Sequence, residues 1–393
     1  TFPILAKYKI NNIMSFKNWL KETKDVIQEK YSSHLYSEGI NSTDHIKIVP
    51  PKYDLETPKV DGRIILRDNF EKLLNKEDRL IIFGEDSGKI GGVNQGLEGL
   101  QDKYGKVRVA DTGIREATIV GQGIGMAIRG LKPIAEIQYL DYILFCIQII
   151  SDDLATLSYR TKGRQLAPLI IRTRGHRLEG IWHSGSPMAG LIHLIRGVQL
   201  LVPRNMTQAA GFYNALLKAN QPAIVIEPLN GYRIKEKLPS NLGEYCFPIG
   251  KVEILKKGTD VTLISYGSTL NIANKAADKL ELYNISVEVI DVQTLIPFDK
   301  EKEIKQSIIK TNRLLIVDED MPGGASAYIL QQLLDEQKIY PLLDSQPKLL
   351  TAKEHRPAYG EDGDYFSKPS SEDIFESVYE IMHENNPNQF PSL

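Results

Sequence analysis

Short runs of β-branched and other apolar residues alternate with longer segments of helical periodicity from about residue 61 onward, and this alternation leaves few possible folds. The runs predict six strands, at 79–84, 107–111, 132–138, 167–173, 198–203 and 222–228. Strands joined by helical segments pair in parallel, and helices cover both faces of such a sheet. We therefore predict the α/β class, with a doubly wound first domain.

The alternation pauses in a stretch containing Pro and Gly near residues 229–245 and then resumes. Residues 260–267, 286–295 and 313–320 predict further strands, and 371–382 predicts a final amphipathic helix. A repeat of the same pattern after a linker indicates a second, smaller doubly wound domain. The predicted domains are 63–245 and 246–393.

A separate segment precedes the first domain. Residues 12–31 predict an amphipathic helix, because apolar side chains recur at helical spacing among charged ones, at Ile13, Phe16, Leu20 and Ile27. We expect a helical N-terminal segment over 1–36 that needs a partner surface. Residues 37–62, rich in Pro, Ser, Thr and charge, predict a linker. Because the first residue is Thr1, we also expect further chain upstream.

The composition excludes some partners. The formal net charge of the 393 residues is −2, so no basic face for nucleic acid or anionic lipid is expected. The apolar run at 142–150 is shorter than the roughly 20 residues that span a bilayer. Cys146 and Cys246 have neither disulfide nor metal-site spacing, which favours free thiols in a reducing cytoplasm.

Polar residues follow four of the predicted strands. Ligands of open parallel sheets bind beyond the carboxyl ends of the strands, so these positions are the first to consider. They are Glu85 and Asp86, Asp111 to Glu116, Gln138 to Tyr142, and Arg172 to His183. Carboxylates, an amide, a Tyr and His side chains are therefore expected on one rim, as in a pocket that handles protons.

Three glycines, at 121, 123 and 125, follow Glu116. A dinucleotide-binding turn is the first interpretation, but the spacing lacks the third glycine and lies within a predicted helix rather than at a strand-to-helix turn. We expect these small residues to pack helix on helix, including across a subunit interface. Taken alone, Glu116 in the first helical turn is better explained by the helix dipole, and His183 is equally well a solvated loop residue.

Ordered motifs from about Ile81 to Pro387 resemble the beta subunit of the first, decarboxylating component of 2-oxo acid dehydrogenase complexes, in the transketolase superfamily. The similar stretches of the first domain read FGEDSGKIGGVNQG, TGIREATIVGQGIGMA, PIAEIQYLDY and HSGSP, and those of the second read DVTLISYG, VEVIDVQTLIPFD and VDED. The resemblance implies a thiamine pyrimidine-binding domain followed by a transketolase C-terminal-like domain.

The resemblance also implies a cofactor and partners. Thiamine diphosphate would be shared with an alpha-type diphosphate-binding half, which would hold magnesium, because the GDG and Asn motif of that half is not found in this sequence. The N-terminal helix is similar to the end of an alpha subunit, so the alpha half is either separate or fused. A pair of beta halves in an α2β2-like assembly, a lipoyl acyltransferase and a structural potassium ion complete the expected partners.

Residue roles follow from the matched motifs. By resemblance, Glu116 hydrogen-bonds the pyrimidine nitrogen opposite the amino group and stabilises the tautomer that takes the thiazolium proton. Tyr142 and Gln138 line the pyrimidine, and Ile114 is an apolar wall. Glu85 is expected to be hydrogen-bonded towards Glu116 or its counterpart across the dimer. The alternative is that Tyr142 only packs under a helix and that Gln138 only closes a strand end.

The same resemblance implies that His183 faces the reacting groups and the lipoyl group, as a proton donor or orienting group. The sequence departs from the family nearby, with Arg115 beside the key acid and three arginines before the histidine. Arg172, Arg174 and Arg177 either hold a substrate carboxylate or bind acids of the acyltransferase. Their role is left open.

The function expected from this resemblance is oxidative decarboxylation of a 2-oxo acid and acylation of a lipoyl acyltransferase, with branched-chain 2-oxo acids, such as 2-oxoisovalerate, slightly favoured over pyruvate. Two alternatives remain. One is a transketolase-like or deoxyxylulose phosphate synthase-like half, which would not depend on lipoamide. The other is a non-catalytic dimerisation and docking subunit, and the presence of both Glu116 and His183 argues against it.

Overall fold

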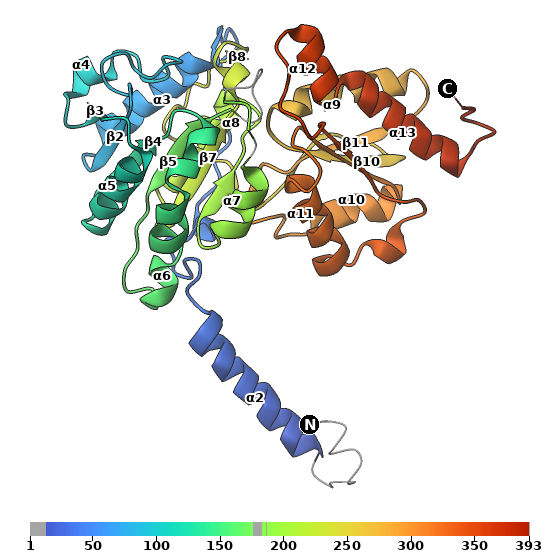
Figure 1. The fold of residues 1–393 in the computed structure, drawn as a ribbon, viewed down its shortest axis with the longest axis horizontal. Coiled ribbons are helices and arrows are strands. Elements are labelled where there is room, and N and C mark those ends of the chain that lie inside the picture. The colour runs from blue at the N-terminus through green and yellow to red at the C-terminus, as the bar shows by residue number, and fades with distance from the viewer. Residues whose placement is uncertain (1–12, 176–182, 186, 393) are drawn as a thin grey trace.

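The computed structural model describes residues 13–175, 183–185 and 187–392. It contains two α/β units side by side, each built on one sheet, and a helix that projects from the first unit (Figure 1). The α/β class, the two parallel-sheet units and the N-terminal helix are as predicted. Within these described residues, no helix is both long and apolar enough to cross a membrane.

The first unit is built on a seven-stranded sheet in the order β12-β6-β7-β5-β4-β2-β3. All neighbours pair in parallel except β12, which is antiparallel to β6. The strands are β2 (Leu80–Gly84), β3 (Val109–Asp111), β4 (Lys132–Glu136), β5 (Ile170–Arg174), β6 (Gln199–Leu201), β7 (Ala223–Glu227) and β12 (Thr294–Ile296).

Helices cover both faces of this sheet because successive strand residues point to opposite sides. Ile82 lies in the buried cluster under α3 (Gly62–Lys76) and α8 (Met206–Leu216). Phe83, the next residue, lies in the cluster under α5 (Glu116–Ile128) and α7 (Met188–Leu194). The double covering explains why the strands read as continuous apolar runs rather than as an alternation.

The second unit has a five-stranded sheet in the order β14-β13-β10-β11-β9, antiparallel only between β11 and β9. Its strands are β9 (Glu253–Lys256), β10 (Val261–Ser265), β11 (Val287–Asp291), β13 (Leu314–Asp318) and β14 (Lys348–Thr351). One face packs on α9 (Leu270–Glu281) and α13 (Ser371–Asn385), and the other on α10 (Glu303–Thr311) and α11 (Ala325–Gln331). Ser370 and Asp373 form a capping box that fixes the start of α13.

Shorter elements connect these layers. The short α-helices are α4 (Leu100–Tyr104), α6 (Leu157–Arg160) and α12 (Glu361–Ser367). The 3-10 and π elements are η1 (Thr43–His45), η2 (Leu140–Phe145), η3 (Ile149–Leu154), η4 (Leu229–Tyr232), η5 (Gly267–Thr269), η6 (Gln332–Glu336) and η7 (Tyr340–Leu342).

The two units share a core. One buried apolar cluster runs from the α5 and α7 face of the first sheet to β10, β11, α10 and α11 of the second unit. The predicted strand 286–295 is interrupted near Gln293, whose φ is 61°. The residues before the break form β11, and those after it form β12 on the other sheet. We propose a domain boundary between 63–245 and 246–393. Strand β12 belongs to the second range in sequence but to the first sheet in space.

Polar contacts also join the units. Arg204 donates to Asp291 at 2.6 Å, and burial raises the pKa of Asp291 to about 6, although Arg204 opposes that shift.

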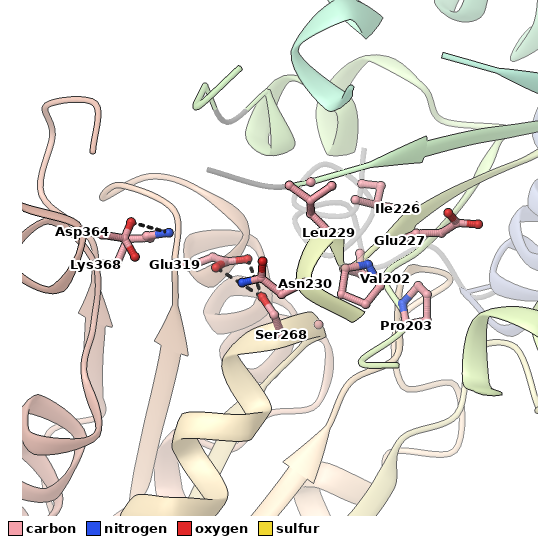
Figure 2. Close-up of a pocket in the computed structure, with 13 residues that line it drawn as sticks. Val202, Pro203, Ile226, Glu227, Leu229, Asn230, Ser268, Glu319, Asp364 and Lys368 are labelled. Carbon is pink, nitrogen blue, oxygen red and sulfur yellow. Dashed lines mark hydrogen bonds and ion pairs between the residues drawn. The ribbon is translucent and has the colours of Figure 1, made fainter. Parts of the chain in front are cut away.

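A polar cleft of about 160 Å³ lies beyond the carboxyl ends of β10 and β13 (Figure 2). There Ser268 contacts Glu319 at 3.3 Å, and Lys368 pairs with Asp364 at 2.7 Å within α12 and its C-cap.

The N-terminal helix is α2 (Ile13–Ser32), and it extends away from both units (Figure 1). Large apolar side chains such as Trp19 and Val26 are exposed on it, as expected for a helix that needs a partner. The following segment, predicted as a linker, packs on the first unit. Thr43 donates to Gln221 at 2.9 Å, and β1 (Lys59–Asp61) pairs with β8 (Lys235–Lys237).

Candidate active site

Three neighbouring strands end at one hollow. β4, β2 and β3 are adjacent and parallel, so the turns that follow them meet at the same edge of the sheet. The hollow has a volume of about 530 Å³ and is lined by Glu85, Ile114, Arg115, Glu116, Ala117, Gln138, Tyr142 and Phe145. Every residue that the sequence assigned to cofactor binding therefore lines one hollow.

Glu116 is the first residue of α5. Arg115, in an extended conformation, precedes it as N-cap, so the helix begins at the edge of the hollow. The Glu116 side chain is half-buried, and among the described residues it has no hydrogen-bond or ion-pair partner. A carboxylate at a helix N-terminus is stabilised by the helix dipole, and this one still has its oxygens available to a ligand.

A second carboxyl group lines the same hollow. Burial raises the pKa of Glu85, and the negative charges of Asp86, Glu116 and Glu136 raise it further. Gln138 is tied to this edge because its amide donates to Asp86 at 3.0 Å. The hollow thus combines one carboxyl group that holds its proton to higher pH than usual with a second, unpartnered one.

We expect Glu116→Gln to lower the pKa of Glu85 towards the ordinary glutamate value, because the substitution removes one of the charges that raise it. A pH titration by NMR with labelled glutamate would measure the shift. Glu372→Gln is the control, since Glu372 pairs with Lys279 in the second unit. A pKa of Glu85 that stays the same or rises in Glu116→Gln would show that the two carboxyl groups do not interact.

His183 lies against two tyrosine rings. Its ring stacks on Tyr139 with centroids 4.7 Å apart and meets Tyr142 edge-on at 5.1 Å. The Tyr142 hydroxyl lies 3.4 Å from Nε2 of His183. Burial raises the pKa of Tyr142, with smaller contributions from Tyr139, Glu85 and Glu116, so its hydroxyl stays protonated and able to donate. Tyr142 therefore connects the hollow to the histidine.

Two of the three arginines whose role the sequence left open are buried in the first sheet. Arg172 is the middle residue of β5 and Arg174 its last, and both are only 1% exposed. Arg172 pairs with Glu136 and, at 2.8 Å, with Glu227, while Arg174 pairs with Glu136 at 2.7 Å. Both guanidinium groups thus pair with buried carboxylates of the same sheet, which argues against the interpretation that they bind a substrate or an acyltransferase. Arg177 lies outside the described residues.

Comparison with known proteins places these features in a family. Residues 58–235 match the transketolase pyrimidine-binding domain, and residues 250–362 match the transketolase C-terminal domain. The pyruvate dehydrogenase E1 component subunit beta of Acholeplasma laidlawii is 34% identical over 69% of this chain and 83% of its own length. The 2-oxoisovalerate dehydrogenase subunit beta of Bacillus subtilis is 31% identical over 68% of this chain and 82% of its own length.

The chain belongs to the family of 2-oxo acid dehydrogenase E1 beta subunits. Its fold is also similar to a solved structure described as a split gene transketolase, inactive beta4 tetramer, with a TM-score of 0.64 and 18% identity. That alignment covers 82% of this chain and 98% of the other. The resemblance inferred from the sequence is confirmed at the level of family and fold.

Some residues of this E1 beta subunit's hollow were missed from sequence. Phe145 lies in an apolar run that reads as core, yet its side chain is 69% exposed at the hollow. Tyr139 belongs to the matched stretch PIAEIQYLDY, but only the structure shows its ring against His183. Arg115 and Ala117 flank Glu116 and also line the hollow.

Within the described residues, the glycines of α5 in this E1 beta subunit do not pack against another helix. At Gly123 an added Cβ would lie 2.6 Å from the Leu169 side chain, which precedes β5, so this glycine lets the helix approach the sheet layer. At Gly121 and Gly125 an added Cβ would meet nothing within 4 Å among the described residues. These two positions are on the exposed face of the helix.

Proposed function

We propose that this chain supplies the pyrimidine-binding half of a thiamine diphosphate-dependent 2-oxo acid dehydrogenase active site, shared with an alpha-type half. The observation that carries this proposal is the unpartnered carboxylate of Glu116 at a hollow that Glu85, Gln138 and Tyr142 also line. Family membership supports the cofactor class, because the matched domain is the transketolase pyrimidine-binding domain.

The lining of the hollow fits an aminopyrimidine ring. Glu116 offers a carboxylate to a ring nitrogen, while Ile114, Tyr142 and Phe145 offer apolar and aromatic surface to the ring faces. When bound, the cofactor supplies the electron sink for decarboxylation. In this proposal Glu116 holds the proton at the pyrimidine nitrogen. Gln138 and Glu85 contact the polar edge of the pyrimidine and orient the ring in the hollow.

The hollow is incomplete in the single chain. Ile114 is 76% exposed and Phe145 69%, and Leu144, which precedes Phe145, is also exposed. Apolar side chains gathered around a ligand-sized hollow indicate a surface that another chain covers. We propose that an alpha-type half covers it and brings the diphosphate and magnesium sites, and that a second beta half packs beside it.

The exposed face of α5 gives a test of this assembly. We expect Gly121→Leu to weaken the association of this chain with its partner chains by about 10- to 100-fold. A bulky side chain at this position would overpack a close interface. Stability of the isolated chain should not fall, since an added Cβ there meets nothing within 4 Å. Analytical ultracentrifugation of this chain with the alpha-type half would measure the amounts of isolated chain and of assembled complex. Gly121→Ala is the matched control, and unchanged assembly of Gly121→Leu would place the interface elsewhere.

His183 suits the second half-reaction. In the first half-reaction the 2-oxo acid loses carbon dioxide. In the second, reductive acylation, its acyl group bonds to one lipoyl sulfur as the S–S bond breaks, and the other sulfur takes a proton. The two electrons that reduce the disulfide come from the cleaved carbon–carbon bond. We propose that His183 donates or orients that proton, with Tyr142 at its Nε2, when a lipoyl acyltransferase presents its lipoyl group.

The test is a pair of assays on the complete cytoplasmic complex with its alpha-type half, fused or separate. We expect 2-oxo acid-dependent release of carbon dioxide with thiamine diphosphate and magnesium, and acylation of a lipoyl domain, with 2-oxoisovalerate used slightly better than pyruvate. Replacing potassium by sodium tests for the structural ion. Ketol transfer between sugar phosphates without lipoyl dependence would instead establish the transketolase-like alternative, and no activity would leave the docking role.

A further inference from the structure

Asp141 joins three parts of the molecule near His183. It lies in η2, between the two tyrosines that contact the histidine ring. Its Oδ2 accepts a hydrogen bond from the backbone N–H of Gly185 at 3.0 Å. The same oxygen accepts a hydrogen bond from Nη1 of Arg356 at 3.2 Å. Arg356 belongs to the second unit, in the segment between β14 and α12.

The contact with Gly185 leaves no room for a side chain. A Cβ at that position would lie 2.2 Å from Oδ1 of Asp141, so the backbone rests directly on the carboxylate. Gly185 is two residues from His183, whose φ of 60° is unusual for a residue with a side chain. A backbone held in a sparsely populated conformation needs surrounding contacts to keep it there. The Asp141 carboxylate supplies one such contact, through the backbone N–H of Gly185.

The charges match this arrangement. The Asp141 side chain is 14% exposed and that of Arg356 is 49% exposed, so the pair stands at the surface with the carboxylate on the inner side. A partly buried carboxylate that accepts both a backbone N–H and a guanidinium is well satisfied. Loss of either donor leaves the other intact, which allows their contributions to be separated.

We infer that Asp141 and Arg356 are positioning residues for His183, and that the second unit thereby helps set the geometry of acyl transfer to the lipoyl group. This inference rests on the proposed function. Asp141 orients His183 through Gly185, and Arg356 orients Asp141. Neither residue lines the hollow where decarboxylation is proposed to occur, so the two half-reactions should respond differently.

The variants separate the two contacts of Asp141. Asp141→Asn keeps an oxygen for the Gly185 N–H but removes the charge that pairs with Arg356, and Arg356→Met removes the same pair from the other side. Asp141→Ala removes both contacts. The matched control is Lys348→Met, which breaks an exposed ion pair with Glu380 in the second unit, 2.6 Å in length.

Reductive acylation of a lipoyl domain is expected to fall about two- to five-fold in Asp141→Asn and in Arg356→Met, as for an exposed ion pair. The double variant should be no worse than Arg356→Met alone, because Asp141→Asn then removes an ion pair that is already lost. Asp141→Ala should lose about 10-fold or more, since misplacing a reacting group is costly. Decarboxylation with an artificial electron acceptor should stay within about two-fold, and Arg356→Lys should recover much of the loss.

A readout without turnover completes the test. Carbethoxylation of His183, followed by mass spectrometry of its peptide, should be faster in Asp141→Ala than in wild type or Lys348→Met. Equal losses in both half-reactions, or additive losses in the double variant, would overturn the positioning role. Full acyl transfer in Asp141→Ala would overturn it as well. If wild type itself lacks 2-oxo acid-dependent activity, the proposed function fails instead.

Discussion

Glu116→Gln is expected to lower 2-oxo acid decarboxylation by about 10²–10⁴-fold, the range for loss of a positioned acid–base group. Glutamine has nearly the same shape and lines the same hollow, but it cannot carry the negative charge that a pyrimidine nitrogen needs from its partner. In the described structure, Glu116 has no other hydrogen-bond or ion-pair partner that the substitution would disturb. The loss should therefore appear in kcat and leave the fold unchanged.

The measurement compares carbon dioxide release by the complete complex, wild type and variant, at saturating thiamine diphosphate. Cofactor affinity is measured beside it by calorimetry, so that weaker binding is not mistaken for slower chemistry. Glu98→Gln is a suitable control, because Glu98 pairs with Arg63 at 2.8 Å and does not line the hollow. Wild-type activity in Glu116→Gln would remove Glu116 from the mechanism.

Arg172→Met is expected to destabilise the first unit by about 3–5 kcal/mol, because it removes the cation paired with Glu227 and one of the two paired with Glu136. Arg172 donates to Glu136, to Glu227 at 2.8 Å and to the Tyr232 hydroxyl at 3.0 Å. Although burial favours the neutral acid, Arg174 and Arg172 hold the pKa of Glu136 below its usual value. Removing one guanidinium therefore leaves a buried negative charge without its counter-ion.

Urea denaturation followed by circular dichroism would measure this change. Lys348→Met again serves as control, since an exposed ion pair contributes at most about 1 kcal/mol. Substituting the cluster together, with apolar residues at 136, 172, 174 and 227, should cost less than Arg172→Met alone, because no charge is then left unpaired. A loss below about 1 kcal/mol in Arg172→Met would mean that water reaches the cluster.

Much of the fold could be predicted because its signals are local. All six runs predicted as strands before residue 230 contain a strand of the first sheet. The strands that sequence missed, β1, β8, β9 and β14, have three or four residues each and none has a fully buried pattern. Such edge segments lack the continuous apolar run that identifies a central strand.

Predictions about the site divided along a similar line. Residues at strand ends, such as Glu85 and Gln138, could be placed on one rim because parallel strands align their carboxyl ends. The fate of Arg172 and Arg174 could not, because the carboxylates that neutralise them come from β4 and β7, far away in sequence. A polar residue directly after an apolar run looks the same whether it faces a ligand or a buried counter-ion.

The strand β12 also affects the order in which the protein can fold during synthesis. Its residues, Thr294–Ile296, complete the edge of the first sheet beside β6, although all other strands of that sheet are made before residue 230. Until the ribosome has released residue 296, the outer edge of β6 lacks its partner, and unpaired edges promote association between chains. A nascent first unit therefore waits for part of the second before its sheet is closed.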